Sequence, residues 1–148
     1  MSKKSDDGLW DLVSRNLRPP DWRLTRIETG MTAAGVPDVS GASRLLPGDF
    51  WIELKATDGW RPVFRPLQVG WATLRTEAGS RVYIMTRRRC AASTRRPAAD
   101  QLWIHHGRDI REVAEGGLQA ADPLGMWCGG PGGWDWDEVE RTIAETVF

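Results

Sequence analysis

Residues 35–41 read GVPDVSG and residues 50–56 read FWIELKA, and this stretch decides the fold. The second segment is strongly apolar, as the strand of a buried sheet is, and the first is short and extended. Between them, Pro47-Gly48 is a favourable turn signal. We therefore predict strands over 36–42 and 50–56 that pair antiparallel as a hairpin.

The segments around this hairpin alternate between helical and strand patterns. Before it we predict a helix over 6–17 that ends before Pro19-Pro20, a strand over 22–29 and a loop over 30–35. After it, a helix starting at Pro66 and ending near Gly79 presents an apolar face made by Leu67, Trp71, Leu74 and Ala78.

The remaining part of the chain predicts a strand over 81–86, a basic loop over 87–100 and a strand over 101–105. Glycine-rich sequence follows, and a last helix begins near Asp135. The order of elements predicts an α/β fold with a central mixed sheet flanked by helices. We expect residues 1–108 to form the core and 109–148 an acidic extension whose terminal helix packs on the same domain.

Length and composition limit the class of protein. A chain of 148 residues with two cysteines has the size of one domain and no disulfide framework. It has no apolar run long enough to span a membrane, and its start, MSKKSDDG, lacks the apolar core of a signal peptide. We expect a cytoplasmic protein of a bacterial or phage-infected cell, without a membrane partner or a small-molecule cofactor.

The net charge of zero conceals an uneven distribution. Residues 60–108 carry ten arginines against two acids, whereas residues 109–148 carry two arginines against nine acids. A neutral protein can bind nucleic acid through one basic face, so the middle third is the candidate DNA-facing region; a merely solvated arginine-rich surface is the alternative. The acidic segment either packs away from that face, pairs with a second subunit or shields the groove.

The hairpin carries the candidate catalytic and metal-binding residues. In the strand 50–56, Glu53 and Lys55 point to one face. Fourteen residues lie between Asp38 and Glu53. Burial of such charges is costly without compensation. Two converging carboxylates suit Mg²⁺, with Mn²⁺ as a substitute, and a lysine beside them can assist an attacking water. A turn cap at Asp38 and an edge-strand ion pair form the structural alternative.

Pro37-Asp38 followed by Glu53-x-Lys55 resembles the PD-(D/E)XK nuclease superfamily. The segments GVPDV, WIELKA, RPLQVGW and RVYIMTR are similar to its VRR-NUC and phage-type junction-resolvase branches. The resemblance covers about residues 7–105. It implies a restriction-endonuclease-like core, Mg²⁺-dependent cleavage of DNA and often a homodimer, and it matches Gln68 and Trp71 to recurring helix positions.

Further residues are assigned to the same site with less support from the pattern. Gln68 borders the apolar face of its helix, where its amide can hold a water or a phosphate oxygen. The resemblance also implies an acid from the first helix, which Asp6, Asp7 or Asp11 can supply; we choose Asp7 as the metal ligand, with helix capping as the alternative. Glu28, at the end of the first strand, is a second candidate ligand, or else a strand-end carboxylate paired with Arg26.

The arginines and tryptophans complete the set of candidates. Phosphate contacts, which add affinity without sequence reading, are predicted for Arg61, Arg65, Arg87, Arg88 and Arg89. Five of the nine tryptophans, at 10, 22, 51, 71 and 103, are predicted in the core. Trp60, Trp127 and Trp134 fall in loops, where they can stack on unpaired bases or fill a dimer interface.

These patterns together predict a metal-dependent, structure-selective DNA endonuclease that resembles a homodimeric Holliday junction resolvase. A flap, repair or DNA-processing nuclease of the same superfamily is the first alternative. A DNA-binding or inhibitory module that retains the fold without turnover is the second.

Overall fold

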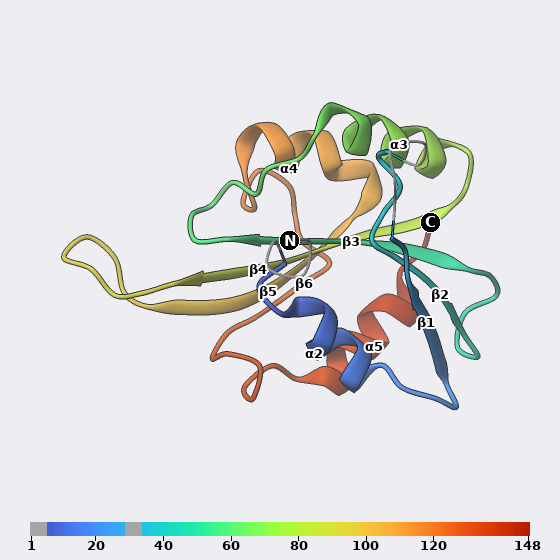
Figure 1. Cartoon of the computed structure of the whole chain (residues 1–148), viewed down its shortest axis with the longest axis horizontal. Coiled ribbons are helices and arrows are strands. Elements are labelled where there is room, and N and C mark those ends of the chain that lie inside the picture. The colour runs from blue at the N-terminus through green and yellow to red at the C-terminus, as the bar shows by residue number, and fades with distance from the viewer. Residues whose placement is uncertain (1–5, 29–33) are drawn as a thin grey trace.

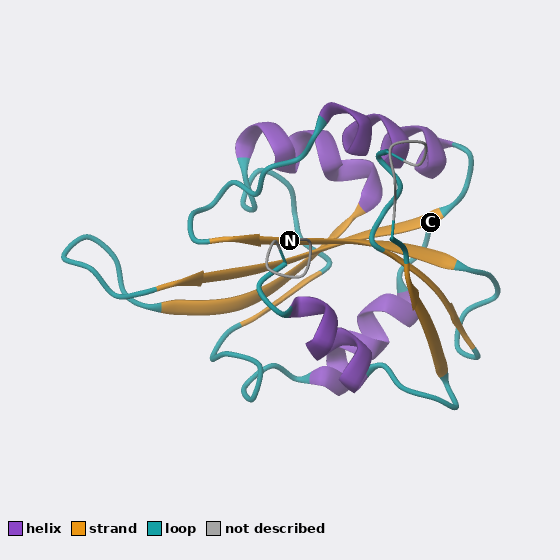
Figure 2. Cartoon of the chain, viewed as in Figure 1, coloured by secondary structure: helices purple, strands orange, loops and turns teal. Residues whose placement is uncertain are grey.

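A six-stranded mixed β-sheet forms the centre of the protein and carries helices on both faces (Figures 1 and 2). The structure is a computed structural model that describes residues 6–28 and 34–148. The order of the strands in the sheet follows the order in the chain. β3 and β4 run parallel, and the other neighbouring pairs are antiparallel. The predicted α/β class with a mixed sheet is confirmed.

The elements have the following bounds. The strands are β1 (Trp22–Arg26), β2 (Val39–Ser43), β3 (Phe50–Thr57), β4 (Arg81–Cys90), β5 (Ala99–His106) and β6 (Gly125–Trp127). The helices are α2 (Leu9–Asn16), α3 (Pro66–Glu77), α4 (Ile110–Gly116) and α5 (Trp136–Glu145), with a 3₁₀ turn, η2 (Gly107–Asp109), before α4. Most of the loop predicted over 30–35 lies outside the described residues.

The predicted hairpin is present, with Val39 of β2 opposite Ile52 of β3. The parallel pair β3 and β4 is connected through α3, as parallel strands require a crossover. The predicted helices over 6–17, from Pro66 and from Asp135 are also found, each with somewhat different ends. β6 and α4 were not predicted, because a three-residue strand and a seven-residue helix carry too little periodicity.

One element was predicted too short. The strand expected over 81–86 continues to Cys90, and its ladder with β5 runs as far as the pair Cys90–Ala99. The prediction of a basic loop over 87–100 is therefore wrong for its first and last residues, and Arg87, Arg88 and Arg89 belong to a strand. A run of three arginines indicates a loop only if their side chains face water, and two of these do not.

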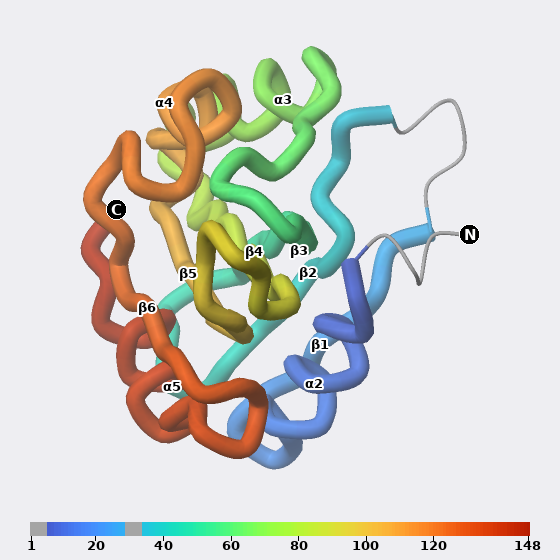
Figure 3. Tube along the Cα trace, turned by 90° about the vertical axis from the view of Figure 1, so that its left-hand side faces the viewer, coloured from blue at the N-terminus to red at the C-terminus, as the bar shows by residue number. Residues whose placement is uncertain are grey.

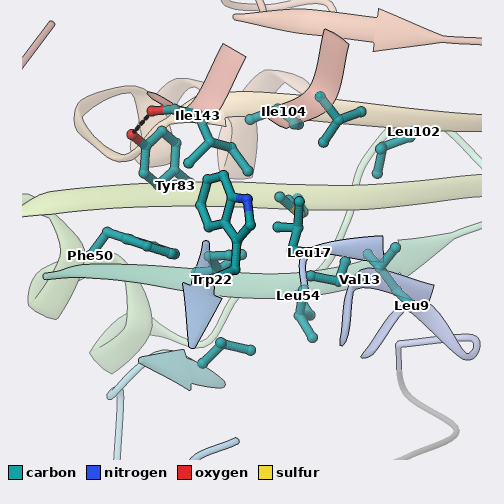
Figure 4. Close-up of a cluster of buried hydrophobic side chains, with 14 of the residues drawn as sticks. Leu9, Val13, Leu17, Trp22, Phe50, Leu54, Tyr83, Leu102, Ile104 and Ile143 are labelled. Carbon is teal, nitrogen blue, oxygen red and sulfur yellow. Dashed lines mark hydrogen bonds between the residues drawn. The ribbon is translucent and has the colours of Figure 1, made fainter. Parts of the chain in front are cut away.

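The larger part of the core lies between one face of the sheet and the helices α2 and α5 (Figures 1 and 4). Ile52 and Leu54 point into it, as the alternation in β3 predicts. The hydroxyl of Tyr83 donates a hydrogen bond to the carbonyl of Ile143 at 2.6 Å, which ties α5 to β4. The acidic C-terminal helix therefore packs on the face of the sheet opposite α3.

Helices α3 and α4 cover the other face (Figure 1). The predicted buried face of α3 is wrong: Leu67 and Leu74 are 62% and 68% exposed, whereas Gln68 and Ala72 are buried. The small side chain of Ala72 brings the helix close to the sheet, and Gln68 finds polar partners there. Trp71 is partly buried against Trp51 instead of being a core residue.

The other tryptophans divide unevenly between core and surface. Trp22 and Trp103 are buried, as predicted, and Trp10 and Trp51 are partly buried. Trp127 and Trp134, assigned to loops, are also buried, whereas Trp60 is 41% exposed. Of the three tryptophans predicted in loops, Trp60 alone has a large exposed surface. No helix among the described residues is long and apolar enough to span a bilayer.

We expect two glycine substitutions to have opposite effects on stability. A Cβ at Gly41 in β2 would overlap the Phe50 ring and a Leu24 methyl group, so Gly41→Ala should lower the free energy of unfolding by about 2 kcal/mol. A Cβ at Gly70 in α3 meets nothing within 4 Å, so Gly70→Ala should raise it by up to about 1 kcal/mol. Urea denaturation measures both. Equal effects would contradict the packing described around Gly41.

Candidate active site

Polar side chains from the first three strands and α3 line one pocket of about 760 Å³. The four residues predicted to be catalytic, Asp38, Glu53, Lys55 and Gln68, all lie in its wall. Glu28 and Arg65 line it as well. Residues that are far apart in the chain thus meet at the end of the hairpin, beside the start of α3.

The two carboxylates are brought together by the pairing of β2 with β3. Val39 is opposite Ile52, so the next pair outward is Asp38 and Glu53, and opposed side chains in an antiparallel pair lie on the same face. Oδ2 of Asp38 accepts a hydrogen bond from the backbone N–H of Leu54 at 2.8 Å. This bond holds the Asp38 carboxylate across the strand, next to Glu53.

Gln68 connects Glu53 to Lys55. Its Nε2 donates to Oε2 of Glu53 at 3.0 Å, and its Oε1 accepts from Nζ of Lys55 at 3.0 Å. The same oxygen accepts the backbone N–H of Arg65 at 2.9 Å, which fixes the side chain to the first turn of α3. Both ends of the amide are engaged by protein groups, so Gln68 positions the other two side chains, and these three bonds use one of the two N–H groups of its Nε2.

Glu53 is held in an environment unfavourable to its charge. It is 3% exposed, and the ammonium of Lys55 lies 3.4 Å from its Oε2. Burial, and next the neighbouring carboxylate of Asp38, raise the pKa of Glu53 to about 8, against the lowering effect of Lys55. The protein groups around Glu53 therefore offset only part of the free-energy cost of burying its negative charge.

We expect Glu53→Gln to stabilise the protein at alkaline pH. Because the folded-state pKa lies above the unfolded value of 4.5, the wild type loses stability as the pH rises from about 4.5 to about 8. The amide has no such titration, so its melting temperature should exceed that of the wild type by about 3 °C or more at pH 8 and approach it near pH 4.5. Differential scanning calorimetry without divalent cations measures both.

The same variant tests whether a cation compensates Glu53. Added Mg²⁺ should raise the melting temperature of the wild type at pH 8 and leave that of Glu53→Gln unchanged, since ligand binding to the folded state stabilises it. Glu138→Gln, on the opposite face in α5, is the matched control. A wild type whose stability does not fall between pH 5 and pH 8 would contradict the environment described for Glu53.

The first-helix acid lies elsewhere than predicted. Asp7, chosen as a metal ligand, does not line the pocket: its Oδ1 lies 2.6 Å from Nη2 of Arg89, and its Oδ2 lies 3.9 Å from Nε of Arg87. Its neighbour Asp6 is buried, lies 3.5 Å from Nη2 of Arg26, and is close enough to Asp38 for the two carboxylates to repel each other. Burial raises the pKa of Asp6. The structure thus brings Asp6 to the edge of the site.

Asp6 was an alternative to Asp7 that we did not choose, and Arg26 was not predicted to lie in the site. Arg26 lines the pocket and pairs with Asp6. Three aspartates, at 6, 7 and 11, precede or begin the first helix, and nothing in their spacing distinguishes them. Glu28, predicted as a metal ligand or as a partner of Arg26, is exposed and lines the same pocket as Arg26.

The predicted phosphate-binding arginines fall into two groups. Arg61 and Arg65 are exposed near the pocket, as a DNA contact requires, and Arg89 is exposed but paired with Asp7. Arg87 and Arg88 are 7% and 5% exposed and bind protein groups. Their guanidinium groups are already bonded within the fold, so the structure offers Arg61 and Arg65, and not these two, as accessible partners for a phosphate.

The number and type of acidic side chains in the pocket are those that Mg²⁺ requires. Among residues 6–28 and 34–148, no group of three or more histidine, cysteine or acidic side chains is placed to hold a metal ion. Mg²⁺ is bound through one or two carboxylates, with waters and phosphate as its other ligands. Asp38 and Glu53 supply that number, and a cation beside them would relieve the repulsion that raises the pKa of Glu53.

Comparison with known proteins adds no assignment. No protein-family model matches the chain, and no curated protein or solved structure matches it.

Proposed function

We propose that the chain is a Mg²⁺-dependent endonuclease of the PD-(D/E)XK type that hydrolyses phosphodiester bonds in DNA. The observation that carries this proposal is the convergence of Asp38, Glu53 and Lys55 in one pocket, joined through Gln68. The order α2-β1-β2-β3-α3-β4 agrees with the order predicted from the sequence, and the mixed sheet flanked by helices is compatible with the proposal.

Each side chain has a separate task in this proposal. Asp38 and Glu53 bind the cation, which when bound polarises the phosphate and makes water a better nucleophile. Lys55 is 15% exposed at its side chain and holds a positive charge next to the carboxylates, where it stabilises negative charge developing on the phosphate. Gln68 holds the side chains of Glu53 and Lys55 in position. The exposed Arg61 and Arg65 bind the DNA phosphates on either side of the cleaved one.

The proposed substrate is branched DNA, as for a junction resolvase. The helices and strands of the described residues form the sheet and the layers that cover it. Recognition of DNA shape by this surface needs no additional base-reading element, so we favour it over recognition of a base sequence. Resolution of a four-way junction requires two symmetric cuts, and a twofold dimer supplies two sites. We therefore propose a homodimer, for which light scattering should give twice the 16.6 kDa of one chain.

Cleavage of defined DNA structures tests the proposal. The purified protein is incubated with labelled four-way junction, splayed arm, 5′ flap and linear duplex, with Mg²⁺ or with EDTA. Asp38→Ala and Glu53→Ala run alongside, and Glu138→Ala serves as a folded control with an acid removed from the opposite face. Symmetric, Mg²⁺-dependent cuts in the junction alone, absent from the two site variants, are the expected result.

Other outcomes change the proposal in defined ways. Cutting of flaps or linear DNA retains the site and replaces the resolvase with a repair or processing nuclease. Cleavage that survives both site substitutions refutes the assignment of the site. DNA binding that is equal with and without chelator, with no cleavage of any substrate, identifies a binding module instead.

A further inference from the structure

The segment between β3 and α3, residues 58–65, places exposed aromatic and basic side chains beside the candidate active site. Val63 and Arg65 line the pocket, and Val63 is 81% exposed. Trp60 and Arg61, earlier in the segment, are also exposed. Asp58 is the one acid in residues 58–65, against Arg61 and Arg65. The segment beside the pocket therefore carries exposed basic and apolar side chains.

Trp60 is held firmly although its ring is exposed. Its carbonyl accepts the backbone N–H of Leu118 at 2.7 Å. The guanidinium of Arg88 stacks on the indole, 3.7 Å from the ring centroid, and the ring of Trp103 meets it edge-on at 6.0 Å and 87°. The indole therefore keeps one orientation before any ligand arrives.

Arg88 is itself fixed and shields one face of Trp60. Its Nε donates to the carbonyl of Gly59 at 3.0 Å and its Nη1 to Oε1 of Gln101 at 3.3 Å, while the residue is 5% exposed. Arg88 covers one face of the indole, the ring of Trp103 lies nearly perpendicular to it, and 41% of Trp60 remains exposed. Part of the indole surface is thus available to an incoming ligand.

The distance from Trp60 to the pocket suits a nucleic-acid strand. Three residue steps separate Trp60 from Val63, so their Cα atoms are at most about 11 Å apart. Along one strand of a duplex, phosphates follow one another at about 3.4 Å of axial rise, so this distance corresponds to about three nucleotides. Figure 3 shows the segment passing over the sheet beside the β4–β5 hairpin, to which Arg96 ties it through the carbonyl of Asp58 at 2.8 Å.

We propose that Trp60 stacks on a base that is unpaired at the branch point, within about three nucleotides of the cleaved phosphate, so that it recognises branched DNA whose bases separate where the strands exchange. This inference rests on the proposed nuclease function. A base is favoured over an apolar protein partner because the exposed side chains of Arg61 and Arg65 accompany the indole, against one acid in residues 58–65, Asp58. Aromatic rings within a basic groove are typical of single-strand binding.

Binding in EDTA separates stacking from cleavage. Fluorescence anisotropy measures the affinity of labelled single-stranded, splayed-arm and fully paired DNA for the wild type, Trp60→Phe and Trp60→Leu. Leucine keeps apolar cover on Arg88 and removes the aromatic face, whereas phenylalanine retains a ring. Trp60→Leu should weaken binding of the two DNAs with unpaired bases by about fivefold to 150-fold and leave duplex binding unchanged. Trp60→Phe should lose much less.

An abasic substrate and a surface control make the test specific. Removing the base that contacts Trp60 from the splayed arm should weaken wild-type binding as much as Trp60→Leu does, with no further loss when both changes are combined. Leu74→Ala, an exposed apolar residue on the outer face of α3, should bind all three DNAs normally. Equal losses on duplex and unpaired DNA, or no loss in Trp60→Leu, would overturn the inference, as would a failure to bind any DNA.

Cleavage with Mg²⁺ distinguishes this inference from the proposed function. Cutting by the wild type together with unchanged selectivity in Trp60→Leu refutes the stacking and retains the nuclease. Trp60-dependent binding without cleavage of any substrate refutes the nuclease and retains the stacking surface. Weaker binding of unpaired DNA by a Trp60→Leu protein that still cuts the four-way junction supports both.

Discussion

Lys55→Met is expected to lower kcat for Mg²⁺-dependent DNA cleavage by about 10²- to 10³-fold, the usual effect of removing one group that stabilises developing charge. Methionine keeps the apolar stem of lysine, which packs near the ring of Phe64, and removes the ammonium, whose Nζ lies 4.9 Å from the centroid of that ring. The affinity for DNA measured in EDTA should change little, because the ammonium already has two protein partners in the free site.

Single-turnover kinetics with a linear or branched substrate that the wild type cuts measures this effect. Lys55→Arg is the informative companion, because it retains the charge but not the compact geometry that fits between Glu53 and Gln68. Partial activity in Lys55→Arg and almost none in Lys55→Met would indicate a role for the charge. A loss smaller than tenfold in Lys55→Met would remove Lys55 from the proposed chemistry.

Asp100→Ala is expected to lower the free energy of unfolding by about 3 kcal/mol, because it leaves a buried guanidinium without its main partner. Arg87 donates to both carboxylate oxygens of Asp100, from Nε at 2.9 Å and from Nη2 at 2.7 Å, and is 7% exposed. Asp7 is the second acid near it, at 3.9 Å. The value lies at the low end for a buried pair because the side chain of Asp100 is 23% exposed.

Thermal denaturation measures this loss, which corresponds to about 6 to 12 °C for a domain of this size. Arg89→Ala is the matched control: it removes an arginine two residues further along β4 whose side chain is 51% exposed, and its exposed pair with Asp7 should contribute less than about 1 kcal/mol. An Asp100→Ala protein that melts with the wild type would mean that Arg87 is solvated, and would restore it as a candidate for DNA contact.

This result also determines which arginines can report on DNA binding. A variant of Arg87 or Arg88 disturbs β4 or the Trp60 surface and changes affinity indirectly. Arg61 and Arg65 are exposed, so their substitution should weaken DNA binding and reduce its salt dependence without changing the melting temperature.

The sequence pattern was sufficient to predict the site where the relevant residues lie within one segment of the chain. The alternation in FWIELKA separated Glu53 and Lys55 from Ile52 and Leu54, because side chains along a strand alternate strictly between two faces. The turn at Pro47-Gly48 predicted the hairpin, and the hairpin register then brings Asp38 opposite Glu53. The central part of the candidate site followed from this one segment.

The sequence pattern led to a wrong prediction where the buried face of a helix depends on the residues that it packs against. In α3 the stripe containing Leu67 and Leu74 is the more apolar one, yet the helix turns Gln68 and Ala72 inward. Helical periodicity assigns a face by hydrophobicity alone. Here three hydrogen bonds to Gln68 and the close approach permitted by Ala72 outweigh the burial of two leucines.

The α/β class, the hairpin and its three charged residues could be predicted from the sequence, because each depends on contacts between residues close in the chain. The burial of Arg87 and Arg88, the approach of Asp6 instead of Asp7 to Asp38, and the exposure of Trp60 follow only from the folded chain. Their partners, Asp100, Gly59, Arg26 and Leu118, come from other elements of the fold. The environment of a charged or aromatic side chain is set by such distant groups, which no periodicity in its own segment encodes.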